Sequence, residues 1–288
     1  MSPPGRPKGE YRRAQPEGTR VNAPLAFITG ASSGIGQALA ERYLRAGWRL
    51  ALVARRREAI ETWLQPLALE PGRCTIYPAD VQDIDAITGA GTRCLGELGL
   101  PDTVIANAGV SVGVDTAERG DIDVLRDVFA TNVVGMAATF QPFIAPMRDR
   151  RRGRLAGVAS VAAIRGLPGH GAYCGSKAAV LAYCESLRGE CRPYGVQVVT
   201  LVPGYVATPL TAANPYPMPF IISAEHFAER AFEAVEAGVS YRVIPWQMAV
   251  VTRLLRVLPN AWFDRLLANR GRKPRRTPQT PGSGSAAP

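Results

Sequence analysis

Histidine and cysteine are scarce in this chain of 288 residues, which holds two histidines and five cysteines. The cysteines are odd in number, and no two of them have the C-x-x-C spacing of a zinc site or a redox motif. This pattern indicates neither a disulfide framework nor a zinc site. We therefore expect reduced cysteines in a cytoplasmic protein. They are Cys74, Cys94, Cys174, Cys184 and Cys191.

Long apolar segments are also missing. The sequence has no run of 18 apolar residues, and its first 20 residues are polar, without the apolar core of a signal peptide. We therefore expect neither a membrane-spanning helix nor secretion. Internal repeats are absent as well.

The net charge of +10 is concentrated near the two ends. Residues 1–20 contribute +3 and residues 269–288 contribute +5, so the residues between them add only about +2. Both ends are rich in proline, glycine and arginine, which predicts disordered basic tails at 1–22 and 269–288. We interpret the tails as solvated and expect no nucleic-acid partner. Weak attraction to anionic lipid or nucleic acid is the alternative.

Strand-like and helix-like segments alternate from Leu25 to about Ile244 without an interdomain linker. Such alternation predicts an α/β fold: a single domain with a Rossmann-like, doubly wound parallel sheet of about seven strands and helices on both faces. The domain is expected at 23–245, followed by amphipathic helices at 246–268. The expected strands are 25–29, 49–54, 73–78, 102–106, 154–159, 196–202 and 240–244.

A glycine-rich turn follows the first expected strand. Gly30, Gly34 and Gly36 have G-x-x-x-G-x-G spacing, and a helical apolar pattern runs from Gly36 to Arg45. Glycine lets a pyrophosphate approach the main chain, and the helix N-terminus behind it offers free N–H groups. The alternative is a strand-to-helix turn without a ligand.

Tyr173 and Lys177 are four residues apart, and Ser160 precedes the tyrosine by thirteen. On one helix, this spacing places the ammonium beside the phenol. A fixed positive charge there is expected to lower the phenol pKa, which would make Tyr173 a usable acid or base near neutral pH.

Together these motifs resemble the short-chain dehydrogenase/reductase family, in its single-domain subgroup. The resemblance covers residues 25–210 well and stays general from 211 to 244. Further matching positions are Asp80 near the adenine, the turn Asn107-Ala108-Gly109, Asn132, and Pro203-Gly204 with Thr208 following.

The resemblance implies a catalytic role for four residues. Tyr173 would exchange a proton with the substrate oxygen while hydride moves to or from the nicotinamide. Lys177 would bind the nicotinamide ribose and lower the tyrosine pKa, and Ser160 would polarise the carbonyl. Asn132 would keep a helix kinked around a water that relays protons by way of Lys177.

Cofactor choice depends on the end of the second expected strand. Arg55 stands where enzymes specific for NAD usually place an acid, and the nearest carboxylate is Glu58. Because a guanidinium pairs well with phosphate, NADP(H) is preferred and NAD(H) is the alternative. These arginines can instead begin a solvated helix. The expected cofactor-binding residues are Gly30, Ser32, Ser33, Gly34, Ile35, Gly36, Arg55, Arg56, Asp80, Val81, Asn107, Ala108, Gly109, Tyr173, Lys177, Pro203, Gly204, Val206 and Thr208.

The segment 205–222 contains four prolines together with apolar side chains, and in the family it forms a substrate lid. It favours a hydrophobic alcohol or carbonyl substrate. We interpret His170 as a loop residue without a catalytic duty, although it can line the pocket, and His226 as a surface residue. The amphipathic stretches 246–258 and 262–267 suit a membrane surface, a subunit interface or intrachain packing as a lid over the pocket.

We therefore expect an NADP(H)-dependent oxidoreductase that interconverts a secondary alcohol and a ketone, or reduces an aldehyde, as a homodimer or homotetramer. Two alternatives remain. One is a nucleotide-binding regulatory protein without turnover, against which the intact Ser160, Tyr173 and Lys177 argue. The other is a peripheral membrane protein.

Overall fold

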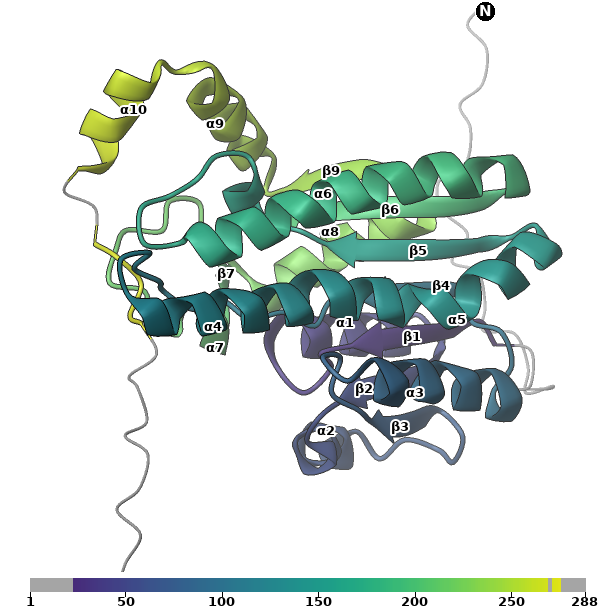
Figure 1. Cartoon of the computed structure of the whole chain (residues 1–288). Helices are drawn as coiled ribbons and strands as arrows, with labels where there is room; N and C mark the ends of the chain where they lie inside the picture. The colour runs from purple at the N-terminus through teal and green to yellow at the C-terminus, as the bar shows by residue number, and fades with distance from the viewer. Residues whose placement is uncertain (1–22, 269–270, 276–288) are drawn as a thin grey trace, which may run out of the picture.

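Seven strands form one parallel sheet in the order β3-β2-β1-β4-β5-β6-β9 (Figure 1). The computed structural model describes residues 23–268 and 271–275. Every expected strand forms, with bounds within one residue of the expected ones. The strands are β1 (Leu25–Thr29), β2 (Arg49–Ala54), β3 (Cys74–Pro78), β4 (Thr103–Ala106), β5 (Gly153–Val158), β6 (Val196–Pro203) and β9 (Tyr241–Ile244).

Helices cover both faces of this sheet, which confirms the predicted doubly wound α/β fold. Two short strands, β7 (Val206–Ala207) and β8 (Ile222–Ser223), form a second small sheet. The helices are α1 (Gly34–Arg45), α2 (Arg57–Leu64), α3 (Ile84–Glu97), α4 (Arg119–Phe129), α5 (Gly135–Arg150), α6 (Gly171–Cys191), α7 (Pro209–Ala212), α8 (Ala224–Glu236), α9 (Trp246–Val257) and α10 (Asn260–Leu267).

A hydrophobic core lies on each face of the sheet. Helices α3, α5 and α6 cover the face that is in front in Figure 1, and Phe140 and Phe143 of α5 are fully buried there. Helices α1 and α8 cover the opposite face, where the rings of Tyr43 and Phe232 meet edge to face at 4.8 Å. All five residues of β1 are buried, as is typical of a parallel strand that is covered on both sides.

The strand order reverses direction between β1 and β4, which are hydrogen-bonded neighbours. The connection from β1 leads through α1 to β2 on one side, and the connection from β4 leads to β5 on the other. In doubly wound sheets this switch point leaves a crevice at the carboxyl ends of the strands, where ligands bind. The fold therefore positions a site beside the glycine turn.

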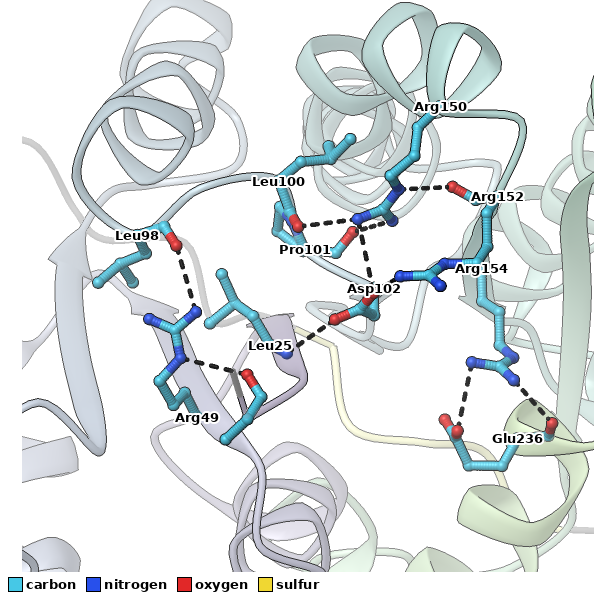
Figure 2. Close-up of polar contacts among 11 residues, drawn as sticks. Leu25, Arg49, Leu98, Leu100, Pro101, Asp102, Arg150, Arg152, Arg154 and Glu236 are labelled. Carbon is cyan, nitrogen blue, oxygen red and sulfur yellow. Dashed lines mark hydrogen bonds and ion pairs between the residues drawn. The ribbon is translucent and has the colours of Figure 1, made fainter. Parts of the chain in front are cut away.

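Arginines connect the strands at the opposite, amino-terminal edge (Figure 2). Asp102 accepts a hydrogen bond from the Leu25 amide at 3.2 Å and pairs with Arg152 at 3.3 Å. Arg154 pairs with Glu236 of α8 at 3.2 Å. These contacts fix the ends of β1, β4 and β5, while the carboxyl edge stays open.

One continuous helical run, Arg119–Arg150, joins α4 and α5 through a π-helical segment at Ala130–Val134. By length and by a mean hydropathy of 1.3 over 18 residues it would suffice to cross a membrane. Half of that window is buried inside the domain, where α5 packs against α3 and α4 packs against α6. We therefore interpret the run as a core helix.

Residues 271–275 pack against the domain, and we call them the C-terminal strap. Gly113 donates its amide hydrogen to the Pro274 carbonyl at 3.1 Å. Arg275 donates to the buried carboxylate of Asp121 at 2.7 Å. For these five residues the predicted disorder is wrong, because Arg275 finds a partner 154 positions earlier in the chain. The remaining predicted tail residues, 1–22, 269–270 and 276–288, lie outside the described residues.

Candidate active site

The glycine turn between β1 and α1 requires glycine at three positions. Gly30 and Gly34 have φ of +69° and +58°, a region that side chains disfavour. Gly36 has an ordinary φ, but a Cβ there would lie 2.1 Å from the carbonyl oxygen of Gly30. The turn is therefore close enough to α1 to exclude any larger residue, and it leaves the helix N-terminus open toward the crevice.

The turn is fastened to the end of β4 by Thr29 and Asn107. The Asn107 side chain donates to the Thr29 carbonyl at 3.1 Å. The Thr29 hydroxyl accepts from the amides of Asn107 at 3.2 Å and Ala108 at 3.3 Å. These bonds hold the two loops on either side of the switch point at a fixed separation.

A cavity of about 420 Å³ opens between these loops, and we call it the cofactor-side cavity. Its lining combines glycine backbone, the N-terminus of α1 and two arginines, a donor set that suits the phosphates of a dinucleotide. The residues present therefore fit the expected cofactor. The expected residues that line the cavity are Gly30, Ser32, Ser33, Gly34, Ile35, Arg55, Arg56, Asp80, Val81, Asn107, Ala108, Gly109, Tyr173, Lys177, Pro203 and Thr208.

Three residues from the expected cofactor set do not line this cavity. Gly36 lies behind the turn. Gly204 faces a second cavity, and a Cβ there would lie 2.8 Å from Met248 Cγ, so glycine at this position admits α9. Val206 is buried, and its carbonyl accepts a hydrogen bond from the Thr211 hydroxyl at 2.6 Å.

Arg55 and Asp80 form an ion pair at 3.8 Å at the rim of the cofactor-side cavity. The Arg55 side chain is 68% exposed, so it lines the cavity at its solvent-facing side. Its neighbour Arg57 pairs instead with Glu61 of α2 at 2.7 Å and is absent from the lining. Of the two, only Arg55 is placed to meet a ligand in the cavity.

Tyr173 and Lys177 line this cavity, and Ser160 lies beside Tyr173 without lining it. Tyr173 and Lys177 lie one turn apart on α6, and Ser160 follows β5, with its hydroxyl within hydrogen-bonding reach of the phenol. The Lys177 Nζ donates to the Val158 carbonyl at 2.8 Å and lies 5.9 Å from the centre of the Tyr173 ring. The expected juxtaposition is therefore present.

The electrostatics of this group differ from the prediction. Burial raises the pKa of Tyr173 to about 12, although the hydrogen bond to Ser160 acts in the opposite direction. Burial also lowers the pKa of Lys177 to about 8. The predicted lowering of the tyrosine pKa is wrong for the protein alone, because removal of the phenol from water outweighs its neighbours.

Asn132 lies in the π-helical segment behind Lys177. Its amide exchanges two hydrogen bonds with the Val110 backbone, at 2.8 and 3.0 Å, and donates to the Ser176 hydroxyl at 2.9 Å. A Cβ on Gly109 would lie 3.2 Å from Asn132 Oδ1 and 3.3 Å from Lys177 Nζ. Asn132 thus joins the loop after β4 to α6 without lining the cavity.

A second, smaller cavity of about 120 Å³ adjoins the other side of Tyr173, and we call it the substrate-side cavity. Both cavities share Tyr173 and Leu210. The lining of the substrate-side cavity is mainly apolar and comes from the segment between β5 and α6, from the loop after β6, and from α9 and α10. The residues that these helices contribute are Met248, Thr252, Leu255 and Phe263.

His170 has a larger part in this cavity than the sequence indicated. It is buried, and its Nε2 lies 3.1 Å from the Tyr216 hydroxyl, while its Nδ1 lies 3.3 Å from the Pro168 carbonyl. Because a carbonyl only accepts, Nδ1 carries a hydrogen in this contact, and Nε2 shares a hydrogen bond with the Tyr216 hydroxyl. The pair thus orients a phenol beside Tyr173. His226 is exposed, as expected of a surface residue.

Sequence reasoning also missed Arg165 and Lys273. Arg165 donates to the Leu258 carbonyl at 2.6 Å and lies over the ring of Phe263, and so holds α10 above the cavity. Lys273 of the strap lines the same cavity and donates to the Leu210 carbonyl at 3.0 Å. An arginine in a loop and a lysine in a basic terminal segment carry no local signal of such contacts.

The fold and the cavity together define a dinucleotide-binding protein of the doubly wound class. A model of the short chain dehydrogenase family matches residues 24–216. An uncharacterized oxidoreductase of Myxococcus xanthus is 40% identical over 241 residues, which cover 83% of this chain and 94% of that protein. Dehydrogenase/reductase SDR family member 7B of Bos taurus is 32% identical over 277 residues, 89% of this chain and 84% of the relative.

Solved structures show the same fold. A short chain dehydrogenase from Burkholderia cenocepacia in complex with NADP has a TM-score of 0.73 at 23% identity, over 86% of this chain and 99% of that one. A short-chain dehydrogenase from Streptomyces avermitilis has a TM-score of 0.71 at 24% identity, over 86% and 95%. The match to the family model and the identity to the two curated relatives show that the chain belongs to the short-chain dehydrogenase/reductase family, whose members are NAD(P)-binding oxidoreductases.

Proposed function

We propose that this protein is an NADP(H)-dependent oxidoreductase that interconverts a secondary alcohol and a ketone, or reduces an aldehyde, on a hydrophobic small molecule. The observation that carries the proposal is the position of Tyr173. Its side chain lines both the cofactor-side cavity and the substrate-side cavity. A proton donor at this boundary can reach a substrate oxygen while the carbon beside it faces the cofactor.

Arg55 supports NADP(H) over NAD(H). It lines the cavity at the end of β2, where its guanidinium can pair with a 2′-phosphate. Asp80 partly neutralises it, since the two side chains lie 3.8 Å apart. When bound, NADP(H) supplies or accepts the hydride.

Tyr173 is suited to act as the acid in carbonyl reduction. With a pKa of about 12 in the protein alone, its phenol is protonated at neutral pH and can donate that proton to a carbonyl oxygen. Ser160 is proposed to hold the same oxygen through its hydroxyl. Lys177 is proposed to bind the ribose and Asn132 to position Lys177, because both lie behind Gly109.

The substrate-side cavity supports a mainly apolar substrate. Leu210, Met248 and Phe263 supply its apolar surface, and Tyr216 adds a polar group held by His170. A small apolar cavity with few polar groups selects by shape and orients the substrate by the hydrogen bonds it offers.

We further propose that the protein is a homodimer or homotetramer in the cytoplasm.

Consumption of NADPH in the presence of a panel of hydrophobic ketones and aldehydes tests the proposal. The wild-type protein should turn over at least one member of the panel, and NADPH should support a higher kcat/KM than NADH. If NADPH binds but no carbonyl compound is reduced, and no alcohol is oxidised with NADP⁺, the protein would instead be a nucleotide-binding protein without turnover.

A further inference from the structure

The two C-terminal helices present an apolar face to solvent on the side opposite the substrate-side cavity. On α9, the exposed residues recur at helical spacing and form one stripe, and α10 continues it with two more. We call these residues the outer face. They are Trp246, Val250, Leu254 and Val257 of α9, and Trp262 and Leu266 of α10.

The exposure of these side chains is unusual for their size. Trp246 is 70% exposed, Trp262 is 67% exposed and Val257 is 78% exposed. Exposed tryptophan and aliphatic side chains that gather on two neighbouring helices are typical of an interaction site. Figure 1 shows α9 and α10 projecting together beyond the carboxyl edge of the sheet. The exposure of the six side chains shows that the body of the domain does not cover the outer face.

The charge around the outer face has a single dominant sign. From Trp246 to Leu267, the span of α9 and α10, the sequence has three basic residues and one acidic residue, Asp264. Arg253 and Arg256 of α9 and Arg265 of α10 are exposed between or beside the apolar residues. An apolar stripe bordered by arginines, with tryptophan among its residues, matches a helix that lies in the interface of an anionic bilayer.

A second copy of the chain is a poorer partner for the same face. A two-fold symmetric contact would place each patch against itself and bring Arg253, Arg256 and Arg265 of both copies together. With Asp264 as the one acid in this segment, such a contact would bury like charges. Anionic lipid headgroups would instead neutralise the arginines while the tryptophans enter the headgroup region.

We propose that the outer face of α9 and α10 docks on the surface of an anionic lipid membrane. The inner faces of the same helices contribute Met248, Leu255 and Phe263 to the substrate-side cavity. Docking therefore brings the roof of that cavity against the bilayer. The proposal concerns binding alone and does not depend on turnover.

The test is co-sedimentation of the full-length protein with vesicles of phosphatidylcholine, with and without phosphatidylglycerol. The wild-type protein should bind the vesicles that contain phosphatidylglycerol. Replacing both Leu254 and Trp262 by serine should lower the binding constant by about tenfold or more through lost apolar burial. Replacing Arg253 and Arg265 by glutamine should lower it by roughly tenfold, and only on anionic vesicles.

Ile84→Ser is the matched control, because Ile84 is 52% exposed on α3 and lies outside the outer face. It should leave vesicle binding unchanged. Melting temperatures of all variants separate lost binding from lost folding. In addition, vesicles with brominated acyl chains should quench the tryptophan emission of the wild-type protein, and Trp246→Phe with Trp262→Phe should remove that quenching.

Two results would overturn the proposal. The first is a folded Leu254→Ser, Trp262→Ser variant that binds anionic vesicles as tightly as the wild-type protein, since binding would then come from basic segments elsewhere. The second is a wild-type protein that co-sediments with neither kind of vesicle. If that protein is also an oligomer that the same two substitutions dissociate, the outer face contacts a second copy instead.

Discussion

Burial acts in opposite directions on Tyr173 and Lys177. Both charged forms are disfavoured away from water, so the pKa of the phenol is raised to about 12 and that of the ammonium is lowered to about 8. Just above neutral pH, the Tyr173 phenol is therefore neutral and the Lys177 amine is partly charged. Spacing in the sequence placed the lysine beside the tyrosine, but the depth of burial depends on elements far away in the chain.

The lowered lysine pKa predicts a pH-dependent stability. Between about pH 8 and the unfolded value of 10.5, Lys177 binds more protons in the unfolded chain than in the folded one, so the contribution of Lys177 to stability should rise with pH. At about 1.4 kcal/mol per pKa unit, the rise is on the order of 3 kcal/mol at most. Lys177→Met should abolish it. Urea unfolding between pH 7 and pH 10 measures the effect, and equal slopes for both proteins would contradict it.

Cofactor preference provides a second prediction at this scale. Arg55→Asp should shift the ratio of kcat/KM for NADPH over NADH toward NADH, because a phosphate partner is replaced by a like charge. Since Arg55 is 68% exposed, solvent weakens the effect, and a shift of about tenfold is expected. Arg57→Asp is the control, since Arg57 pairs with Glu61 outside the cavity. Equal shifts in both variants would mean that Arg55 does not contact the phosphate.

At the scale of elements, the strands follow from the sequence and the C-terminal strap does not. Buried runs such as Leu25–Thr29 are short, apolar and bounded by proline and glycine, so their limits are local properties. The strap is basic and rich in glycine and proline, like a solvated tail. Its order depends on the carboxylate of Asp121 and on the Gly113 backbone, which local composition cannot reveal.

The sequence likewise predicted one part of the candidate site, the cofactor-side cavity, and not the other, the substrate-side cavity. Motif positions along the cofactor-side cavity are marked by glycine spacing and by resemblance to the family. The substrate-side cavity is built from α9, α10, His170 and the strap, which meet only through tertiary packing. Gly204 illustrates the difference: its motif was recognised, but the reason for glycine there is the approach of Met248 from α9.

The strap should contribute to stability through Arg275. The hydrogen bond from Arg275 lowers the pKa of Asp121, so this contribution is present above the unfolded pKa of the carboxyl and is lost as pH falls through the lower folded pKa. Arg275→Ala should reduce the melting temperature by a few degrees near neutral pH and by less in acid. Scanning calorimetry at both pH values measures this.

Arg119→Ala is the control for the strap prediction, because Arg119 is an exposed arginine that pairs within α4 with Asp123. It should change the melting temperature little at either pH. If Arg275→Ala behaves like Arg119→Ala, the strap does not stabilise the domain.

At the scale of the whole molecule, the two edges of the sheet have different tasks. The amino edge is closed by ion pairs such as those of Asp102 and Glu236 (Figure 2), which fix the strands. The carboxyl edge holds the glycine turn, Arg55 and Tyr173, and there the two cavities meet. A stable edge opposite an open edge lets loops carry the chemistry without loosening the sheet.

Transfer of deuterium tests the central claim most directly. The protein is mixed with NADPH that carries deuterium at both hydrogen positions of the reactive nicotinamide carbon and with a carbonyl substrate found in the panel, and the alcohol is analysed by mass spectrometry. The wild-type protein should place one deuterium on the alcohol carbon. Tyr173→Phe should bind NADPH as tightly as the wild-type protein but form product at least ~10²-fold more slowly, because the proton donor is missing. Alcohol without deuterium, or a folded Tyr173→Phe protein that transfers it at the wild-type rate, would contradict the account.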